Sequence, residues 1–396
     1  MKYDAIVVGA GLPGALAAWR LSQAGLKVAV FERNVVAGES SALAAGHVPQ
    51  ESVSPDNLKI LRRTRALVDD IDRRTDGAVR FNIVGGIQVA TQESGKKALE
   101  DHSIRTKKLG GRGELLGAAE VAARWPAIET QDLLAAYYTP DDGFVRSHEL
   151  TITLSSLARM SGAEVVEGSP VDMVAIQDGR VTGVVVGGDV VRAPRVLVAA
   201  GAWSRPLLER SGISLPTKSF VLQAVILNGA TANIPFVSDL EAGYYVMRRT
   251  STSVFLGLPP SSMGVDADAF SRHPEPDDRA RFLEILRCRV PELAGAAAAG
   301  GWAGVLVATP DGWPLLGQHA AEGLFVATGF GGGGVQRVTG AEAVAQVMLG
   351  QEPFVDLTAY RVSRFEGYSG EDFEFRQGPF YYTEWVDAPV EPQWRK

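Results

Sequence analysis

The chain has 396 residues, of which 46% are hydrophobic and 21% are charged, and its formal net charge is −7. This length exceeds one ordinary hydrophobic core, so we expect two closely packed domains. The acidic balance argues against nucleic acid as a partner, because phosphate binding requires a concentrated basic surface.

The first 32 residues predict a strand, a helix and a second strand. Residues 3–8 form a continuous apolar run, which is typical of a strand buried on both faces of a parallel sheet. A helical pattern follows over residues 15–23, and a second apolar strand is predicted over residues 27–32. A β-α-β unit of this length is the usual beginning of a dinucleotide-binding fold.

Glycines occupy the turn between the first strand and the helix. Gly9 permits a tight turn, Gly11 lets the backbone approach a pyrophosphate, and Gly14 lets helix and strand pack closely. The helix N-terminus offers free N–H groups to phosphates. Glu32 ends the second strand, where its carboxylate can accept hydrogen bonds from both hydroxyls of an unphosphorylated ribose. This arrangement favours FAD or NAD over NADP.

The remaining elements alternate between two patterns. Apolar runs that end in glycine recur at residues 195–200 and 323–328, so distant segments are expected to complete one parallel sheet. Antiparallel strands are predicted at residues 81–91 and 134–145, a meander at 171–191, and further strands of a second sheet at 220–227, 244–249 and 253–258. Helices are expected at residues 56–75, 148–161, 276–290 and 336–350.

Two segments of small residues favour FAD over NAD. Residues 38–46 can let the backbone pass over a flat ring system while donating N–H and hydroxyl groups to phosphate. Residues 328–334 are rich in glycine and are expected to open the last long helix near Val335. Such a helix start can stabilise the negative charge that a reduced flavin carries around N1 and O2.

A set of motifs in order along the chain resembles the D-amino-acid-oxidase-type flavoprotein family, which includes glycine oxidase, sarcosine oxidase and related amine dehydrogenases. The motifs are Gly9–Gly14, Glu32, residues 40–46, 138–143, 200–204, 302–304, 309–317 and 329–334. The resemblance covers about residues 3–350. It implies a mixed α/β fold, in which a Rossmann-like FAD-binding domain is interleaved with an antiparallel β-sheet substrate domain and the flavin ring lies at their junction.

The resemblance also implies domain boundaries and cofactor contacts. The FAD-binding domain would comprise residues 1–80, 148–218 and 305–365, the substrate-binding domain residues 81–147 and 219–304, and a C-terminal tail residues 366–396. The residues expected to bind FAD are Gly9, Gly11, Leu12, Pro13, Gly14, Glu32, Arg33, Ser40, Ser41, Ala45, Gly46, Val171, Ala200, Gly201, Trp203, Gly331, Gly332, Gly333, Gly334 and Val335.

The sequence departs from the family pattern at two positions. Leu306 stands where relatives similar to glycine oxidase carry an arginine for the substrate carboxylate, and Gly304 stands where covalent-flavin members carry a cysteine. His47 lies beside the small-residue loop, but its context does not match the covalent attachment motif. We therefore expect non-covalent FAD and a different carboxylate contact.

The candidate substrate contacts lie in two places. Arg248 can bind a carboxylate with two parallel hydrogen bonds, and the hydroxyls of Tyr244 and Tyr245 can add a third. The alternative is a solvated strand arginine beside Arg249. His47 would lie near the flavin edge, where it either contacts the substrate or only packs.

These residues predict an FAD-dependent amine or amino-acid oxidoreductase, either an oxidase or a dehydrogenase. The substrate would be an amino acid or a secondary, N-alkylated amino acid, and its C–N bond would be oxidised by hydride transfer to flavin N5. The resulting imine would hydrolyse. The alternatives are an FAD-dependent hydroxylase or reductase with the same FAD domain, and an FAD-bearing subunit of a larger dehydrogenase complex.

The remaining expectations concern other ligands and location. The histidines show no metal-binding spacing, so we predict no metal site, and Cys288 is expected to be a buried, inert thiol. The chain lacks a run of about 18 apolar residues, so no transmembrane segment is expected and the cytoplasm is the default location. The expected partner is a small-molecule amine or amino acid, and a homo- or hetero-oligomer is possible.

Overall fold

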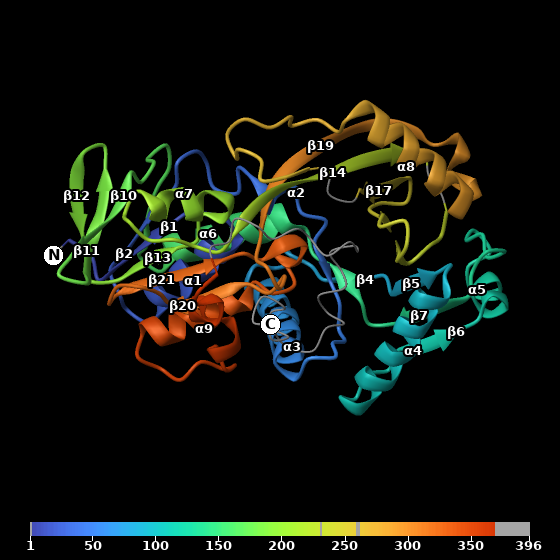
Figure 1. Ribbon diagram of the computed structural model, residues 1–396, viewed down its shortest axis with the longest axis horizontal. Helices are drawn as coiled ribbons and strands as arrows, with labels where there is room; N and C mark the ends of the chain where they lie inside the picture. The colour runs from blue at the N-terminus through green and yellow to red at the C-terminus, as the bar shows by residue number, and fades with distance from the viewer. Residues whose placement is uncertain (1, 230–231, 259–261, 369–396) are drawn as a thin grey trace.

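The computed structural model describes residues 2–229, 232–258 and 262–368, so most of the predicted C-terminal tail lies outside the described residues. The strands form two large sheets, one in each lobe of an elongated molecule (Figure 1). This architecture confirms the mixed α/β fold that the sequence predicts.

The first sheet is mostly parallel. Among the described residues its strands are β1 (Ala5–Val8), β2 (Val28–Phe31), β9 (Glu164–Val166), β13 (Val196–Val198), β20 (Leu315–Gln318) and β21 (Leu324–Thr328). Their order is β20-β21-β13-β1-β2-β9, and β20 alone runs antiparallel to its neighbour. Every residue of β1 and β2 is buried, which explains their continuous apolar sequence.

Helices cover one face of this sheet and a small sheet covers the other. The helices are α1 (Leu12–Gln23), α3 (Pro55–Arg74), α6 (Ser147–Met160) and α9 (Thr339–Met348), and they share one apolar core with the sheet. The opposite face packs against the meander β10 (Met173–Gln177), β11 (Arg180–Val186) and β12 (Asp189–Arg192), and against α7 (Ser204–Glu209). The parallel strands are therefore buried on both sides.

The second sheet is mostly antiparallel and carries a separate core. Among the described residues its strands are β5 (Gly86–Ala90), β6 (Glu114–Leu116), β7 (Ala135–Thr139), β14 (Lys218–Asn228), β15 (Phe236–Asp239), β16 (Tyr245–Arg248), β17 (Ser253–Gly257), β18 (Ser262–Met263) and β19 (Ala297–Ala308). Helices α4 (Glu93–Lys108), α5 (Ala118–Arg124) and α8 (Pro276–Arg289) flank it (Figure 1). The long pair β14 and β19 reaches from this lobe to the parallel sheet.

A small third sheet lies between the lobes. It pairs β3 (His47–Val48) and β4 (Asn82–Ile83) with β8 (Gly143–Phe144), and α2 (Ser40–Leu43) precedes it. The predicted domain boundaries remain a proposal. Sheet membership supports them, although β14 begins at Lys218, one residue before a proposed boundary, and β19 ends at Ala308, past the boundary at residue 304.

Two local predictions need correction. The last long helix begins at Thr339 instead of near Val335, because Gly331–Gly333 forms a short 3-10 helix and the next five residues form turns. Cys288 is exposed, because it lies on the outer side of α8 and not on the face that packs against the sheet.

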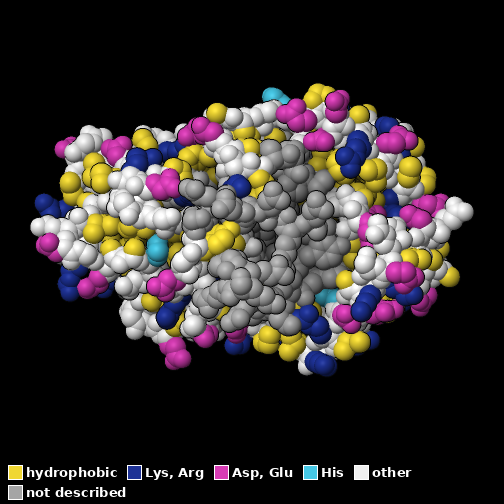
Figure 2. Space-filling model, in the orientation of Figure 1, with side chains coloured by type: hydrophobic (Ala, Val, Ile, Leu, Met, Phe, Trp, Pro, Cys, Tyr) yellow, Lys and Arg dark blue, Asp and Glu magenta, His cyan; other side chains and the backbone are white. Residues whose placement is uncertain are grey.

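Three features bear on possible partners. Basic and acidic side chains are intermixed on the face shown in Figure 2. Among residues 2–229, 232–258 and 262–368, no group of three or more His, Cys, Asp or Glu side chains is arranged to hold a metal ion. In the same part of the chain, no helix has both the length and the apolar character needed to cross a membrane.

Candidate active site

A cavity of about 700 Å³ opens where the parallel strands end. Its walls include residues at the carboxyl ends of β1, β2, β13 and β21 and at the start of α1. Ligands of open α/β sheets bind at this edge, and the volume lies within the usual range for small-molecule and cofactor sites.

The glycines of the first turn are required by contacts in the fold. Gly9 has a φ of +101°, and a Cβ there would lie 2.7 Å from the carbonyl oxygen of Ala199. A Cβ at Gly14 would lie 2.0 Å from the carbonyl oxygen of Gly9, so α1 can pack on the turn only with glycine there. Gly11 precedes α1 and lines the cavity. The start of α1 thus faces the cavity with its backbone accessible.

Glu32 lies at the end of β2, at the edge of the cavity. Its carboxylate accepts hydrogen bonds from the N–H groups of Ala10, at 2.8 Å, and Asn34, at 2.9 Å, and the residue lines the cavity. These two bonds fix the carboxylate at the end of β2. The carboxylate can still accept hydroxyl donors, because each oxygen has more than one lone pair.

An ionic contact that includes Asp268, a residue not predicted from the sequence, closes one end of the cavity. The guanidinium of Arg33 lies 4.0 Å from the ring of Trp203, and its Nη1 lies 2.7 Å from Oδ1 of Asp268. The indole Nε1 of Trp203 donates to the same oxygen at 2.9 Å. The hydrogen bond from Arg33 lowers the pKa of Asp268. Residues 264–268, which lie between β18 and α8 in the chain, therefore cover a cavity built mainly by the parallel sheet.

Most of the predicted cofactor residues line this cavity. They are Gly9, Gly11, Leu12, Pro13, Glu32, Arg33, Ser40, Ser41, Val171, Ala200, Gly201, Trp203, Gly331, Gly332, Gly334 and Val335. Ala45 and Gly46 line a neighbouring cavity instead. Gly14 and Gly333 line neither: Gly14 packs against Gly9, and a Cβ at Gly333 would meet the side chains of Arg337 and Gln336.

The neighbouring cavity, of about 70 Å³, lies between the first cavity and the second sheet. Both cavities are lined by Ser40, Ala44, Leu306, Gly332 and Val335. We call the smaller one the substrate cavity. Aromatic rings from the second sheet form one side of it, namely Phe236, Tyr245 and Phe255 from the adjacent strands β15, β16 and β17, and Trp302 from β19, with neighbouring ring centroids 5.3–5.8 Å apart.

Polar groups are few in the substrate cavity. The imidazole of His47 stacks on Phe236 with centroids 3.9 Å apart, and its Nε2 lies 3.4 Å from Oδ2 of Asp142. The other carboxylate oxygen of Asp142 accepts from the backbone N–H of Gln50 at 2.8 Å. Gln336 is 7% exposed, and its side-chain oxygen has no hydrogen-bond partner. A ligand N–H donor would satisfy that oxygen.

The structure separates the predicted substrate residues into two groups. Successive side chains of a strand point to opposite faces, so Tyr245 faces the substrate cavity whereas Tyr244 and Arg248 do not. Arg248 donates instead to Oδ1 of Asn233 and to the carbonyl oxygen of Thr250. The expectation that Arg248 and Tyr244 meet a substrate beside the flavin is not supported by this geometry.

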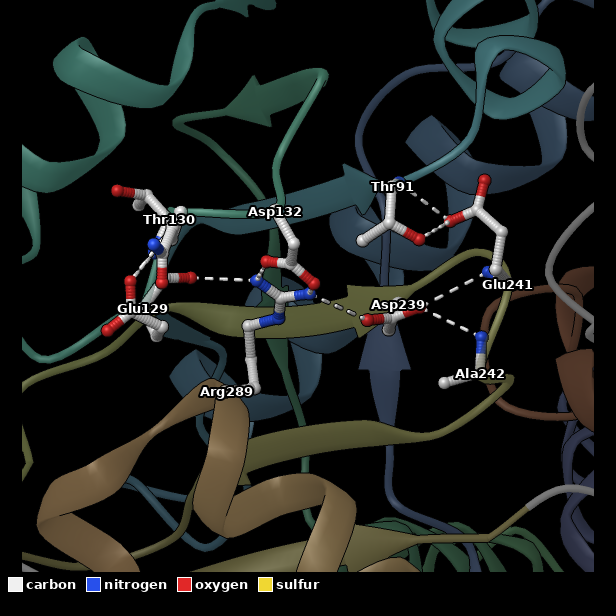
Figure 3. Close-up of polar contacts among 9 residues, drawn as sticks. Thr91, Glu129, Thr130, Asp132, Asp239, Glu241, Ala242 and Arg289 are labelled. Atoms are coloured by element: carbon white, nitrogen blue, oxygen red, sulfur yellow. Dashed lines mark hydrogen bonds and ion pairs between the residues drawn. The ribbon is translucent and has the colours of Figure 1, made fainter.

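Tyr244 lies in a different part of the second lobe, beside the end of α8. The tyrosine is fully buried, and burial raises the pKa of its hydroxyl. It lines a hollow with Arg289, whose guanidinium lies between Asp132 and Asp239 (Figure 3). These ion pairs tie α8 to the loop before β7 and to the end of β15, which indicates a structural role.

Arg249 follows β16 on the side of Tyr245, which is the side toward the substrate cavity that was expected from the sequence for Arg248. Its guanidinium carbon lies 5.6 Å from the ring centroid of Phe255, which lines the substrate cavity. Burial lowers the pKa of Arg249, and in the part of the chain that the structure describes its guanidinium forms no hydrogen bond or ion pair. Arg249 does not itself line the cavity, and the charges of Arg146 and Glu149 also act on it. A half-buried cation with no hydrogen-bonded anion favours an anionic ligand.

Comparisons with known proteins agree with this geometry. A family model described as FAD dependent oxidoreductase (DAO) matches residues 4–347. Glycine oxidase of Geobacillus kaustophilus (strain HTA426) is 27% identical over 380 residues, which cover 93% of this chain and 99% of that protein. Its crystal structure superposes with a TM-score of 0.82 at 25% identity, covering 91% of this chain and 98% of the other.

Two further matches carry names for other amine substrates. The 4-methylaminobutanoate oxidase (formaldehyde-forming) of Paenarthrobacter nicotinovorans is 27% identical over 92% of this chain, but the chain spans about half of that protein, 46% of its length. L-proline dehydrogenase from P. horikoshii has a TM-score of 0.84 at 21% identity, with 92% of this chain and 98% of that one covered, which shows a shared fold.

Proposed function

The chain belongs to the DAO family of FAD-dependent oxidoreductases, and from that premise we propose that it oxidises the C–N bond of an amino acid or of a secondary, N-alkylated amino acid. The observation that carries this proposal is the contact between the two cavities. A small aromatic-walled space adjoins the larger cavity at Gly332 and Val335. A substrate there would lie against whatever part of FAD occupies that end.

The residues around the larger cavity fit FAD. We assign the ribose to Glu32, the pyrophosphate to the N-terminus of α1 with Ser41, and the adenine end to Trp203. Bound FAD would supply a two-electron acceptor for a substrate hydride at flavin N5. We infer that the cofactor is held non-covalently, because no cysteine among the described residues lines either cavity and the sequence around His47, which lines the smaller one, does not match the attachment motif.

The protein would contribute orientation and exclusion of water. The aromatic side chains that line the substrate cavity hold an apolar part of the substrate and keep water away, which strengthens electrostatic interactions inside. We assign the substrate carboxylate to Arg249 on the geometry described above. Loss of hydride from the carbon beside nitrogen gives an imine, which water hydrolyses to an oxo compound and a smaller amine or ammonia.

The test is anaerobic reduction of the FAD-loaded protein by a panel of D-, L- and N-methyl amino acids, followed by absorbance. We expect at least one carboxylate-bearing amine to bleach the flavin within the time of a turnover assay. Bleaching by a nicotinamide cofactor and by none of the amines would favour an FAD-dependent hydroxylase or reductase. If nothing bleaches it, the protein is better described as an FAD-bearing subunit of a larger dehydrogenase complex.

A further inference from the structure

The substrate cavity contains one side chain that can accept a proton near neutral pH. Among the described residues that line it, His47 and Tyr245 carry the titratable groups. A phenol is ordinarily protonated at neutral pH, whereas an imidazole is ordinarily a mixture of both forms. An amine substrate arrives largely as an ammonium ion and must lose a proton before its lone pair can assist hydride loss. His47 is therefore the acceptor that the cavity offers.

The surroundings of His47 suit this task. Stacking on Phe236 at an interplanar angle of 4° fixes the plane of the ring. Nε2 is buried and lies 3.4 Å from Oδ2 of Asp142, a charge contact and not a hydrogen bond. The negative charge on that side favours a proton on Nε2, which leaves Nδ1 to accept. Asp142 is 5% exposed, so its charge is weakly screened and would stabilise an imidazolium ion.

The contact is built by distant parts of the chain. Register pairs His47 with Phe144 between β3 and β8, which brings the turn before β8 beside the imidazole. A Cβ at Gly86 would lie 2.6 Å from Oδ2 of Asp142, so the carboxylate has little room to turn away. The hydrogen bond from the N–H of Gln50 holds its other oxygen.

Apart from Asp142 and from Tyr245, which also lines the cavity, the ionisable groups near His47 have their own partners or face elsewhere. The ionisable groups on β15, on β16 and in the turn before β8 are Asp141, Asp142, Asp239, Tyr245 and Arg248. Asp141 pairs with Arg112, and Asp239 pairs with Arg289. Asp142 is therefore the carboxylate that acts on the imidazole.

We propose that His47 takes the ammonium proton from the bound substrate and that Asp142 is the positioning residue for that transfer. The N–H bond of the ammonium ion breaks, a bond from that proton to Nδ1 forms, and the electron pair stays on the substrate nitrogen. No oxidant is consumed in this step, and the imidazolium formed is paired with the carboxylate. The inference rests on the proposed function, since it requires an amine substrate.

The experiment measures the second-order rate constant for anaerobic flavin bleaching between about pH 6 and about pH 10. In His47→Gln only the neutral amine in solution should react, so at pH 7 the constant should fall about 100-fold, a typical loss for a general base. It should then climb about tenfold per pH unit towards the pKa of the free amine. Asp142→Asn should show a smaller loss with a shifted pH profile, and imidazole in solution should partly restore His47→Gly.

Tyr245→Phe removes the other titratable group of the cavity. Its rate constant should fall by one factor at every pH, because the ring lines the cavity, whereas the shape of its pH profile should stay that of the wild type. FAD content, read from absorbance, separates loss of cofactor from loss of proton transfer. If His47→Gln does not retain FAD, the pH profile of Asp142→Asn decides. In these two variants, a uniform decrease at every pH, or an unchanged constant at pH 7, overturns the role of His47 while amine oxidation stands. A wild-type flavin that no amine bleaches overturns both.

Discussion

Replacing Arg249 by alanine should weaken binding of a carboxylate-bearing substrate, whereas replacing Arg248 should leave it nearly unchanged. The two arginines are adjacent in sequence but lie on opposite faces of one strand. A hydrogen bond between charged groups contributes about 1.5–3 kcal/mol, which corresponds to about 10- to 150-fold in a dissociation constant. The half-buried position of Arg249 favours the upper part of this range, because screening by water is incomplete.

The assay is the concentration dependence of anaerobic flavin bleaching, with the amino acid compared with the amine that lacks its carboxylate. Arg249→Ala should raise the apparent dissociation constant of the amino acid and leave that of the decarboxylated amine unchanged. Arg248→Ala is the matched control, because it removes the same charge from the other face. Equal losses in the two variants, or a larger loss in Arg248→Ala, would refute the assignment of faces.

Three further outcomes follow from the structure. Asp268→Asn should raise the dissociation constant of FAD several-fold, because an exposed ion pair with Arg33 contributes at most about 1 kcal/mol. Salt should raise the dissociation constant of wild-type FAD, because it screens this ion pair, and fluorescence of released FAD measures both effects. Gly14→Ala should yield protein without bound flavin, since the new methyl group would overlap the carbonyl oxygen of Gly9, and the absorbance spectrum checks it. Burial lowers the pKa of His102 to about 4 from 6.5. The unfolded chain therefore binds more protons between those values, so the free energy of unfolding in urea should rise with pH across that window, and less so in His102→Gln.

The parallel sheet was predictable because strands that are buried on both faces are apolar at every position, which is visible in the sequence. The apolar runs at residues 3–8, 27–32, 195–200 and 323–328 correspond to β1, β2, β13 and β21. The Gly9–Gly14 turn and Glu32 were predictable for a related reason. Each satisfies a local requirement of backbone or ligand, so residue type and spacing alone point to it.

The sequence of the long strand β19 shows no comparable apolar run. Its twelve residues include many alanines and glycines, which have low strand propensity, and they pair with β14 along nearly its whole length. The partner strand, and not the sequence of β19 itself, therefore determines this strand. The start of α9 was also missed, because glycines at 331–333 permit both a helix and the tighter turns that are present.

The substrate residues were hardest to predict because their chemistry depends on which way a side chain points. All but one of the residues of β16 are buried, so both of its faces are apolar and alternation of hydrophobic and polar residues cannot distinguish them. A shift of one residue exchanges Tyr244 with Tyr245 and Arg248 with Arg249, and sequence alone offers no preference. His47 and Asp142 show the same limitation over a longer range. They meet only because β3 pairs with β8, a register that nothing in either short segment specifies. A proposed proton-accepting pair of this kind depends on how the strands pair, so it can be identified only from the fold, and substitution of the two side chains tests it.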